Sequence, residues 1–205
     1  MPRHDDDRMP TRGAILMHPG ASARKLTYED FVRFPDDGRR HELVNGVHYV
    51  TPSPAQRHQQ ASWQLSGALF NYLQAHPIGR GFAAPFDIVL SSSDVVEPDI
   101  LVVLNDQLGI LTDANVQGAP AIVIEILSLI TRRRDFGIKR ELYERAGVRE
   151  YWIVDTDQQN VTVHRRPETS APFEETVITL ANADALTSPI LPEFSLPLAT
   201  LFGRS

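Results

Sequence analysis

Hydrophobic and polar positions along the chain predict a series of strands interrupted by a few helices. The longest helical pattern starts with Ser53 as N-cap and Pro54 at the first helical position, and its apolar stripe runs to about residue 75. A second helix is predicted over "DFGIKRELYERAG", residues 135–147, where Gly147 stands at the position of a C-cap glycine. A short helix after Thr27 precedes both.

Strands account for most of the remaining apolar stretches. "HELVNGVHYV" predicts a hairpin, because Asn45 and Gly46 form the turn sequence that best accepts positive φ. Further strands are predicted at residues 81–90, 95–104, 121–128, 149–155, 160–165 and 174–180. The proline-rich residues 188–202 are predicted to form an extended segment. We therefore expect an α/β fold with a mixed central β-sheet, flanking helices and an N-terminal β-hairpin.

Length and composition favour one domain with a tail. The chain has 205 residues, and we expect a polar tail at residues 1–24 followed by a single domain at residues 25–205. The absence of cysteine excludes disulfides and thiolate zinc sites. No apolar run approaches the roughly 18 residues of a membrane span or the about 7–15 of a signal-peptide core, so a cytoplasmic location without membrane contact is expected.

Charge is unevenly distributed. The net charge of −6 argues against a protein that coats nucleic acid, yet residues 131–149 hold seven Lys or Arg against three Asp or Glu. Such a segment suits contact with a polyanion, or it is a solvated helix face with internal ion pairs such as Glu141–Arg145.

Two carboxylates interrupt strands that otherwise appear buried. Glu125 lies within "AIVIEILS" and Asp99 within "VVEPDILVV", and an ionised carboxylate in an apolar interior costs several kcal/mol, roughly, unless it is compensated. Ordinary compensation would be an arginine beside Glu125 and a turn capped by Asp99 after Pro98. If the two carboxylates converge, the natural partner is a divalent cation such as Mg²⁺, which takes oxygen ligands.

The order of these motifs resembles a known family. Asp99 in "EPD", followed by Glu125 in an apolar strand, is similar to the PD-(D/E)xK nuclease superfamily. The stretches "LTYEDFVRFPDDGRRHELVNGVHYVTPSP", "AIVIEILS" and "RRRDFGIKRELYERAGVREYWIVD" resemble the Uma-two family of restriction-endonuclease-like proteins, and so does "SPILPEFSLPLATLF". The likeness runs from about Leu26 to Phe202.

The resemblance implies a restriction-endonuclease-like core that hydrolyses DNA phosphodiester bonds with Mg²⁺ or Mn²⁺. Asp99 and Glu125 would then be metal ligands, with the backbone carbonyl of Ile126 as a third. Glu42, which matches the acidic residue of the family's first hairpin, would complete the acidic cluster. From the sequence alone, a solvent-facing role for Glu42 is an equal alternative.

The sequence departs from the superfamily pattern where the catalytic lysine normally stands. Two residues after Glu125 the chain has Leu127, whereas the Uma-two family generally places its lysine on the following helix, at Lys139 here. Spacing from Ile138 puts Lys139 at the border between sheet contact and solvent. An exposed helix lysine is the alternative. Tyr143 lies one turn further on the same side.

The loop after Glu125 departs too. Family members commonly read Ser-Pro-Ser-Thr there, whereas Ser128 is followed here by Leu129 and Ile130. The candidate phosphate contacts are Arg132, Arg133, Arg134, His58 and Tyr143. Exposed strand edges and the superfamily habit of cutting two strands suggest a homodimer. The rival functions are a degenerate binding or assembly module and a hydrolase of another phosphate ester.

Overall fold

Two proline-containing breaks separate the strands of the two larger β-sheets, and a third, two-stranded sheet forms near the C-terminus. The computed structural model describes residues 24–168 and 170–203. The predicted strand at 81–90 is split at Pro85 into β3 (Gly79–Ala83) and β4 (Ile88–Ser91), and that at 95–104 is split at Pro98 into β5 (Asp94–Val96) and β6 (Ile100–Leu104). Proline has no N–H to donate to a ladder, so at both points the chain leaves one sheet and enters the other.

The first sheet contains the hairpin. Its order is β2 (Val47–Thr51), β1 (Arg40–Val44), β5, β4 and β7 (Val116–Gln117). The second sheet is larger, with the order β11 (Glu174–Thr179), β10 (Asn160–Arg165), β9 (Glu150–Asp155), β8 (Ile122–Ile126), β6 and β3. In each sheet one pair, β4–β7 or β8–β9, is parallel and the other pairs are antiparallel. The predicted mixed α/β class is confirmed, although its division into two sheets was not anticipated.

Helices begin close to the predicted places, with one correction. At α1 (Tyr28–Phe31) the Thr27 backbone N–H donates to Asp30 over 2.9 Å, as the capping pattern indicates. The long helix α2 (Gln56–Ala75) has Ala55 as its N-cap, so the predicted cap at Ser53 is wrong: Ser53 lies outside the first turn. The next helical region comprises α3 (Arg132–Arg134), a π-helical segment (Asp135–Lys139) and α4 (Arg140–Ala146). It ends as predicted at Gly147, with φ of 94°.

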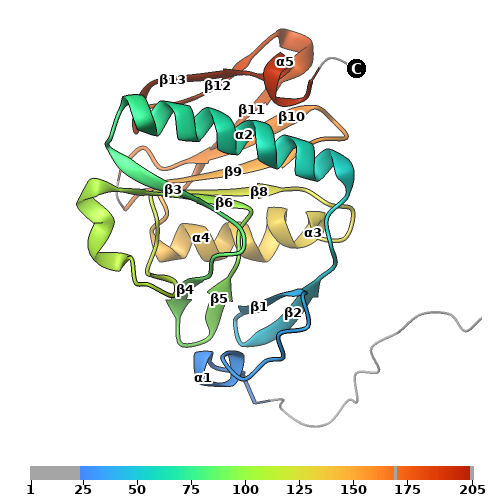
Figure 1. Ribbon diagram of the computed structural model, residues 1–205, viewed down its shortest axis with the longest axis vertical. Coiled ribbons are helices and arrows are strands. Elements are labelled where there is room, and N and C mark those ends of the chain that lie inside the picture. The colour runs from blue at the N-terminus through green and yellow to red at the C-terminus, as the bar shows by residue number, and fades with distance from the viewer. Residues whose placement is uncertain (1–23, 169, 204–205) are drawn as a thin grey trace, which may run out of the picture.

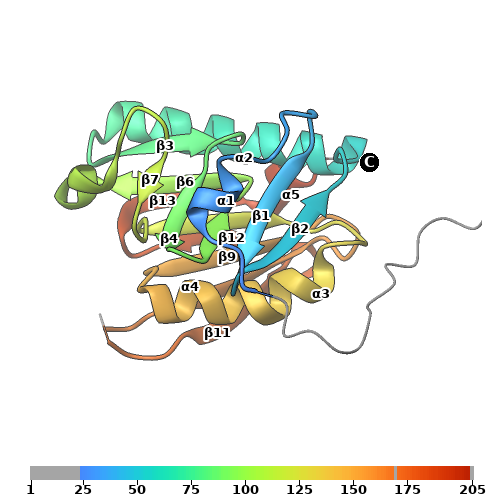
Figure 2. The same cartoon turned by 90° about the horizontal axis from the view of Figure 1, so that it is seen from below.

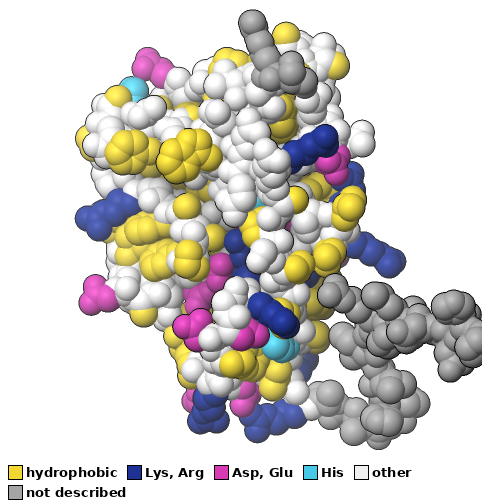
Figure 3. All heavy atoms as spheres, turned by 45° about the vertical axis from the view of Figure 1, so that its right-hand side comes forward, with side chains coloured by type: hydrophobic (Ala, Val, Ile, Leu, Met, Phe, Trp, Pro, Cys, Tyr) yellow, Lys and Arg dark blue, Asp and Glu magenta, His cyan; other side chains and the backbone are white. Residues whose placement is uncertain are grey.

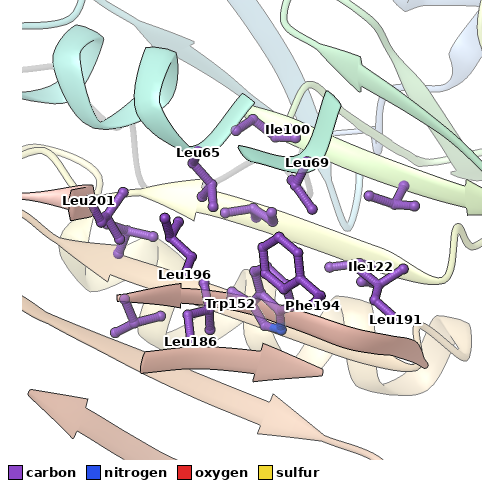
Figure 4. Packing of buried hydrophobic residues seen from close by; sticks show 14 of the residues in the cluster. Leu65, Leu69, Ile100, Ile122, Trp152, Leu186, Leu191, Phe194, Leu196 and Leu201 are labelled. Carbon is purple, nitrogen blue, oxygen red and sulfur yellow. The ribbon is translucent and has the colours of Figure 1, made fainter. Parts of the chain in front are cut away.

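The C-terminal region is more regular than the predicted extended segment. Residues 185–201 form the hairpin of β12 (Ala185–Ser188) and β13 (Leu191–Pro197), followed by the short helix α5 (Leu198–Leu201). Two 3₁₀ turns lie earlier in the chain, at Asn105–Ile110 and Leu180–Asn182. Figure 4 shows how leucines and Phe194 of this hairpin pack with Trp152, Leu65 and Leu69 between α2 and the second sheet. The predicted tail lies outside the described residues except for Arg24.

The layers place the functional residues on one side of the second sheet. As Figure 1 shows, α2 and the C-terminal hairpin cover one face, whereas α3 and α4 lie against the other. Seen from below in Figure 2, the first sheet and α1 adjoin the same side as α3 and α4. Val123 and Leu127, which share a face with Glu125, belong to the core between the two sheets. No helix in the described ranges is long and apolar enough to cross a bilayer.

One histidine is buried in this core. His164 on β10 packs between the rings of Tyr151 and Phe173, with ring centroids 5.8 and 5.9 Å away. Neither ring nitrogen has a hydrogen-bond partner among the residues that the structure describes. Burial lowers the pKa of His164, while the charge of Glu175 acts in the opposite direction.

We predict that His164 destabilises the protein progressively as the pH falls. Below about pH 6.5 the unfolded chain protonates this imidazole more readily than the native state does, so protons favour unfolding. Urea unfolding of the wild type and His164→Phe between about pH 7.5 and about pH 5.5 should show the wild type losing more free energy of unfolding. Parallel pH profiles would contradict this assignment.

Candidate active site

The predicted acidic residues lie together between the two sheets. Glu42 comes from β1, Glu125 from β8, and Asp99 from the crossing between β5 and β6. Their exposed fractions are 0%, 4% and 3%, so none faces open solvent. The hairpin thus contributes Glu42, the larger sheet contributes Glu125, and the break at Pro98 contributes Asp99. The solvent-facing alternative for Glu42 is excluded.

Lys139 joins carboxylates from the two sheets. Its Nζ lies 2.6 Å from Glu42 Oε1 and 2.7 Å from Glu125 Oε1. Burial alone would lower the pKa of Lys139, but the neighbouring carboxylates of Glu125 and Glu42 raise it above its usual value. The two carboxylates therefore favour the charged ammonium form of this side chain.

Lys139 lies on the buried side of its helical region. The predicted position at the border of sheet contact and solvent is wrong, because Lys139 is only 1% exposed. That prediction took Ile138 as the apolar stripe position, whereas the buried side carries Asp135, Lys139, Leu142 and Tyr143. The alternative of an exposed helix lysine is excluded as well.

Glu125 is held by two donors on the same oxygen. Its Oε1 accepts hydrogen bonds from Lys139 Nζ and, over 2.9 Å, from the Tyr143 hydroxyl. Burial raises the pKa of Glu125 to about 8; Lys139 opposes this shift, and the charges of Asp135 and Asp99 add to it. Tyr143 is itself fully buried, so we assign it to positioning Glu125 and withdraw it as a nucleic-acid contact.

Asp99 ties the crossing segment to β8. Its Oδ2 accepts the Ile126 backbone N–H over 2.7 Å and lies 3.1 Å from His58 Nε2, while Oδ1 accepts Arg40 Nη1 over 2.9 Å. Burial acts to raise the pKa of Asp99, but the contacts with His58, Arg40 and Ile126 hold it below its usual value. The carboxylate continues the β6–β8 ladder past its last pairing, Ile100 with Ile124.

The predicted phosphate contacts are mostly engaged within the protein. Arg132 pairs with Asp155, and Arg134 lies 3.1 Å from Glu42 Oε2 and 5.1 Å above the Tyr49 ring. Arg133 is exposed and forms no ion pair within residues 24–168 and 170–203. On the face drawn in Figure 3, acidic and basic side chains lie next to one another instead of forming a basic patch.

Three charged residues of the site escaped sequence reasoning. Arg40 Nε lies 2.9 Å from Glu97 Oε1, and burial raises the pKa of Glu97 to about 6. Asp135 lies 3.9 Å from Lys139, and both of its oxygens are buried without a hydrogen-bond partner in the described chain. Arg40 stands two residues before Glu42 on the same strand face, and Asp135 four residues before Lys139. These two spacings are the sequence signals from which Arg40 and Asp135 could have been predicted as site residues.

The donor set suits a divalent cation. Within the described residues, no three acidic or histidine side chains form a ready group of ligands, so backbone and water oxygens would complete a site on Asp99 and Glu125. Carboxylate and carbonyl oxygens are the hard donors that Mg²⁺ and Mn²⁺ take. Both oxygens of Asp135 are also buried without a hydrogen-bond partner in the described chain. The chemistry of the donors is therefore compatible with such an ion.

This fold is that of the restriction-endonuclease-like class. The chain belongs to the Uma2 family, whose model, described as "Putative restriction endonuclease", matches residues 28–199. A crystal structure from Anabaena variabilis ATCC 29413, described as "a putative nuclease belonging to DUF820", is similar with a TM-score of 0.72 and 20% identity. The match covers 86% of this chain and 97% of that one. No curated protein matches. The predicted family and fold are thus confirmed, whereas the roles of individual site residues stay predictions.

We predict that Lys139 is required for stability as well as geometry. Lys139→Met removes the ammonium and leaves Glu42 and Glu125 buried without it, which should lower the free energy of unfolding by about 3–5 kcal/mol. Arg133→Met, on the same helical region but exposed, should change it by less than about 0.5 kcal/mol. Urea denaturation of both variants at neutral pH measures the difference. Equal stabilities would show that the buried pairs are dispensable.

Proposed function

We propose that this protein is a metal-dependent endonuclease that hydrolyses phosphodiester bonds in DNA. The observation that carries the proposal is the contact between Lys139 and Glu125, 14 residues apart in sequence and joined over 2.7 Å. A lysine beside an acidic pair is the group that the superfamily supplies from the strand position occupied here by Leu127. Family membership and fold support the same reaction class.

Asp99, Glu125 and the backbone carbonyl of Ile126 would hold Mg²⁺ or Mn²⁺. When bound, the ion would polarise a phosphoryl oxygen and favour ionisation of the attacking water. Asp99 is poised for this role because its contacts already keep it ionised. Glu125 would need its charged form, which burial disfavours and a neighbouring cation favours.

Lys139 acts in this proposal as a fixed positive charge. Its raised pKa means that it does not accept a proton from water; it donates hydrogen bonds that orient the water or stabilise charge on the phosphoryl group. Glu42 keeps the ammonium in place over 2.6 Å and is itself paired with Arg134. We assign Glu42 to positioning and Lys139 to catalysis.

DNA is the proposed partner. Arg133 is exposed and has no ion-pair partner among the described residues, so it is free to meet a phosphate, whereas Arg132 and His58 would first have to leave Asp155 and Asp99. A homodimer and a cytoplasmic location remain predictions that accompany this proposal.

One observation favours the rival function, a degenerate module that keeps the fold without the chemistry. Both oxygens of Asp99 already have partners in Arg40, His58 and Ile126, so the acidic cluster is partly compensated without any metal. A module of this kind would bind DNA or protein without cutting. The third alternative, hydrolysis of another phosphate ester, predicts that small phosphoesters compete with DNA.

We expect the wild type to nick supercoiled plasmid in Mg²⁺ or Mn²⁺ and to be inactive in EDTA. The near-isosteric variants Asp99→Asn and Glu125→Gln should each lose at least about a hundredfold in rate, and Lys139→Ala should be strongly impaired. Asp106→Asn, an exposed aspartate paired with Arg149, is the matched control and should retain full activity. Circular dichroism of each variant separates loss of folding from loss of chemistry.

A wild type that is inert on supercoiled, linear and single-stranded DNA with both metals would overturn the endonuclease proposal. Binding of DNA without cleavage would instead support the degenerate module.

A further inference from the structure

The loop between β8 and α3, which follows the strand that carries Glu125, presents two exposed apolar side chains. Leu129 is 88% exposed and Ile130 is 70% exposed. They follow Glu125 by only four and five residues, and Leu127, which connects them, is anchored in the core. The loop therefore leaves the sheet directly from the strand that carries Glu125.

This loop tip has a defined conformation. The Ser128 backbone N–H donates to Thr131 Oγ1 over 3.2 Å, and the Thr131 N–H donates to Ser128 Oγ over 3.1 Å. The two hydroxyls lie 3.0 Å apart, and the Arg132 N–H closes the turn on the Ser128 carbonyl over 3.0 Å. These reciprocal bonds hold Leu129 and Ile130 outward together, although exposing such side chains to water is unfavourable.

The surroundings of the tip indicate what covers it. Arg132, Arg133 and Arg134 follow immediately, and Arg133 has no ion-pair partner in the part of the chain that the structure describes. A nucleic acid offers phosphates for such a cation and apolar base faces for Leu129 and Ile130. A stable protein interface needs about 800 Å² on each partner, more than two side chains supply, whereas a wedge between bases needs only one or two.

We propose that Leu129 and Ile130 form a wedge that enters the base stack of the substrate next to the scissile phosphate. Because unstacking is least costly where bases are already unpaired, the substrate class is DNA with a bulge, mismatch or similar distortion. This inference rests on the proposed function and adds its substrate preference.

The test compares the loop variant Leu129→Ser/Ile130→Ser with a matched control, Val32→Ser/Phe70→Ser. Val32, the C-cap residue of α1, is 60% exposed, and Phe70 on α2 is 63% exposed. The probes are two fluorescein-labelled duplexes of one sequence, fully paired or carrying a two-nucleotide bulge, titrated in Ca²⁺ buffer by anisotropy. The wild type and control should bind the bulged duplex about tenfold more tightly, and the loop variant should lose that ratio. A 2-aminopurine beside the bulge should brighten with the wild type and control but not with the loop variant.

The wedge is overturned if the loop variant keeps both the binding ratio and the 2-aminopurine signal. It is equally overturned if the loop variant changes only the mass measured by light scattering, which would make the tip a protein contact. If the wild type cuts plasmid and the loop variant equals it in the binding ratio and the 2-aminopurine signal, the wedge is overturned while the proposed function stands. A wild type that neither cuts nor binds DNA removes the proposed function with it.

Discussion

The ammonium of Lys139, shared between Glu42 and Glu125, joins the two β-sheets at the candidate site. It links the hairpin sheet to the larger sheet at 2.6 and 2.7 Å and is buried from solvent. A buried ion pair of this kind is weak as a source of net stability, because desolvation offsets much of its Coulomb energy. Its value here lies in position: three charged groups from three separate elements are fixed where a phosphate and a cation could meet.

The backbone around this contact is arranged to serve it. The break at Pro98 brings Asp99 to the end of the β6–β8 ladder, where its carboxylate replaces a backbone partner of Ile126. Arg40 bridges Asp99 and Glu97 from the hairpin side, so two ion pairs join the hairpin to the crossing segment. A cation binding to Asp99 and Glu125 would have to share Asp99 with Arg40, which couples ion binding to the position of the hairpin.

Much of this arrangement could be read from the sequence, because it follows from local patterns. Asn45 and Gly46 define the hairpin, and carboxylates at Asp99 and Glu125 stand out against apolar strands. The burial of Lys139 was missed because the prediction took Ile138 as the apolar stripe position, whereas the side that packs inward carries Lys139 and Tyr143. Pro85 and Pro98 marked interruptions, but that the chain changes sheets there depends on long-range packing. The cap predicted at Ser53 was wrong because capping preference is a local property of the sequence. The first residue of the helix depends on more than that local preference, and the N-cap is Ala55.

Anomalous scattering from a crystal soaked in Mn²⁺ measures whether Asp99 and Glu125 hold a divalent ion beside Lys139. We expect an anomalous peak next to the two carboxylates, with Lys139 still in contact with Glu125. An intact Arg40–Asp99 ion pair with no anomalous peak at these oxygens would contradict metal binding. This chain would then keep the family's fold without metal-dependent hydrolysis.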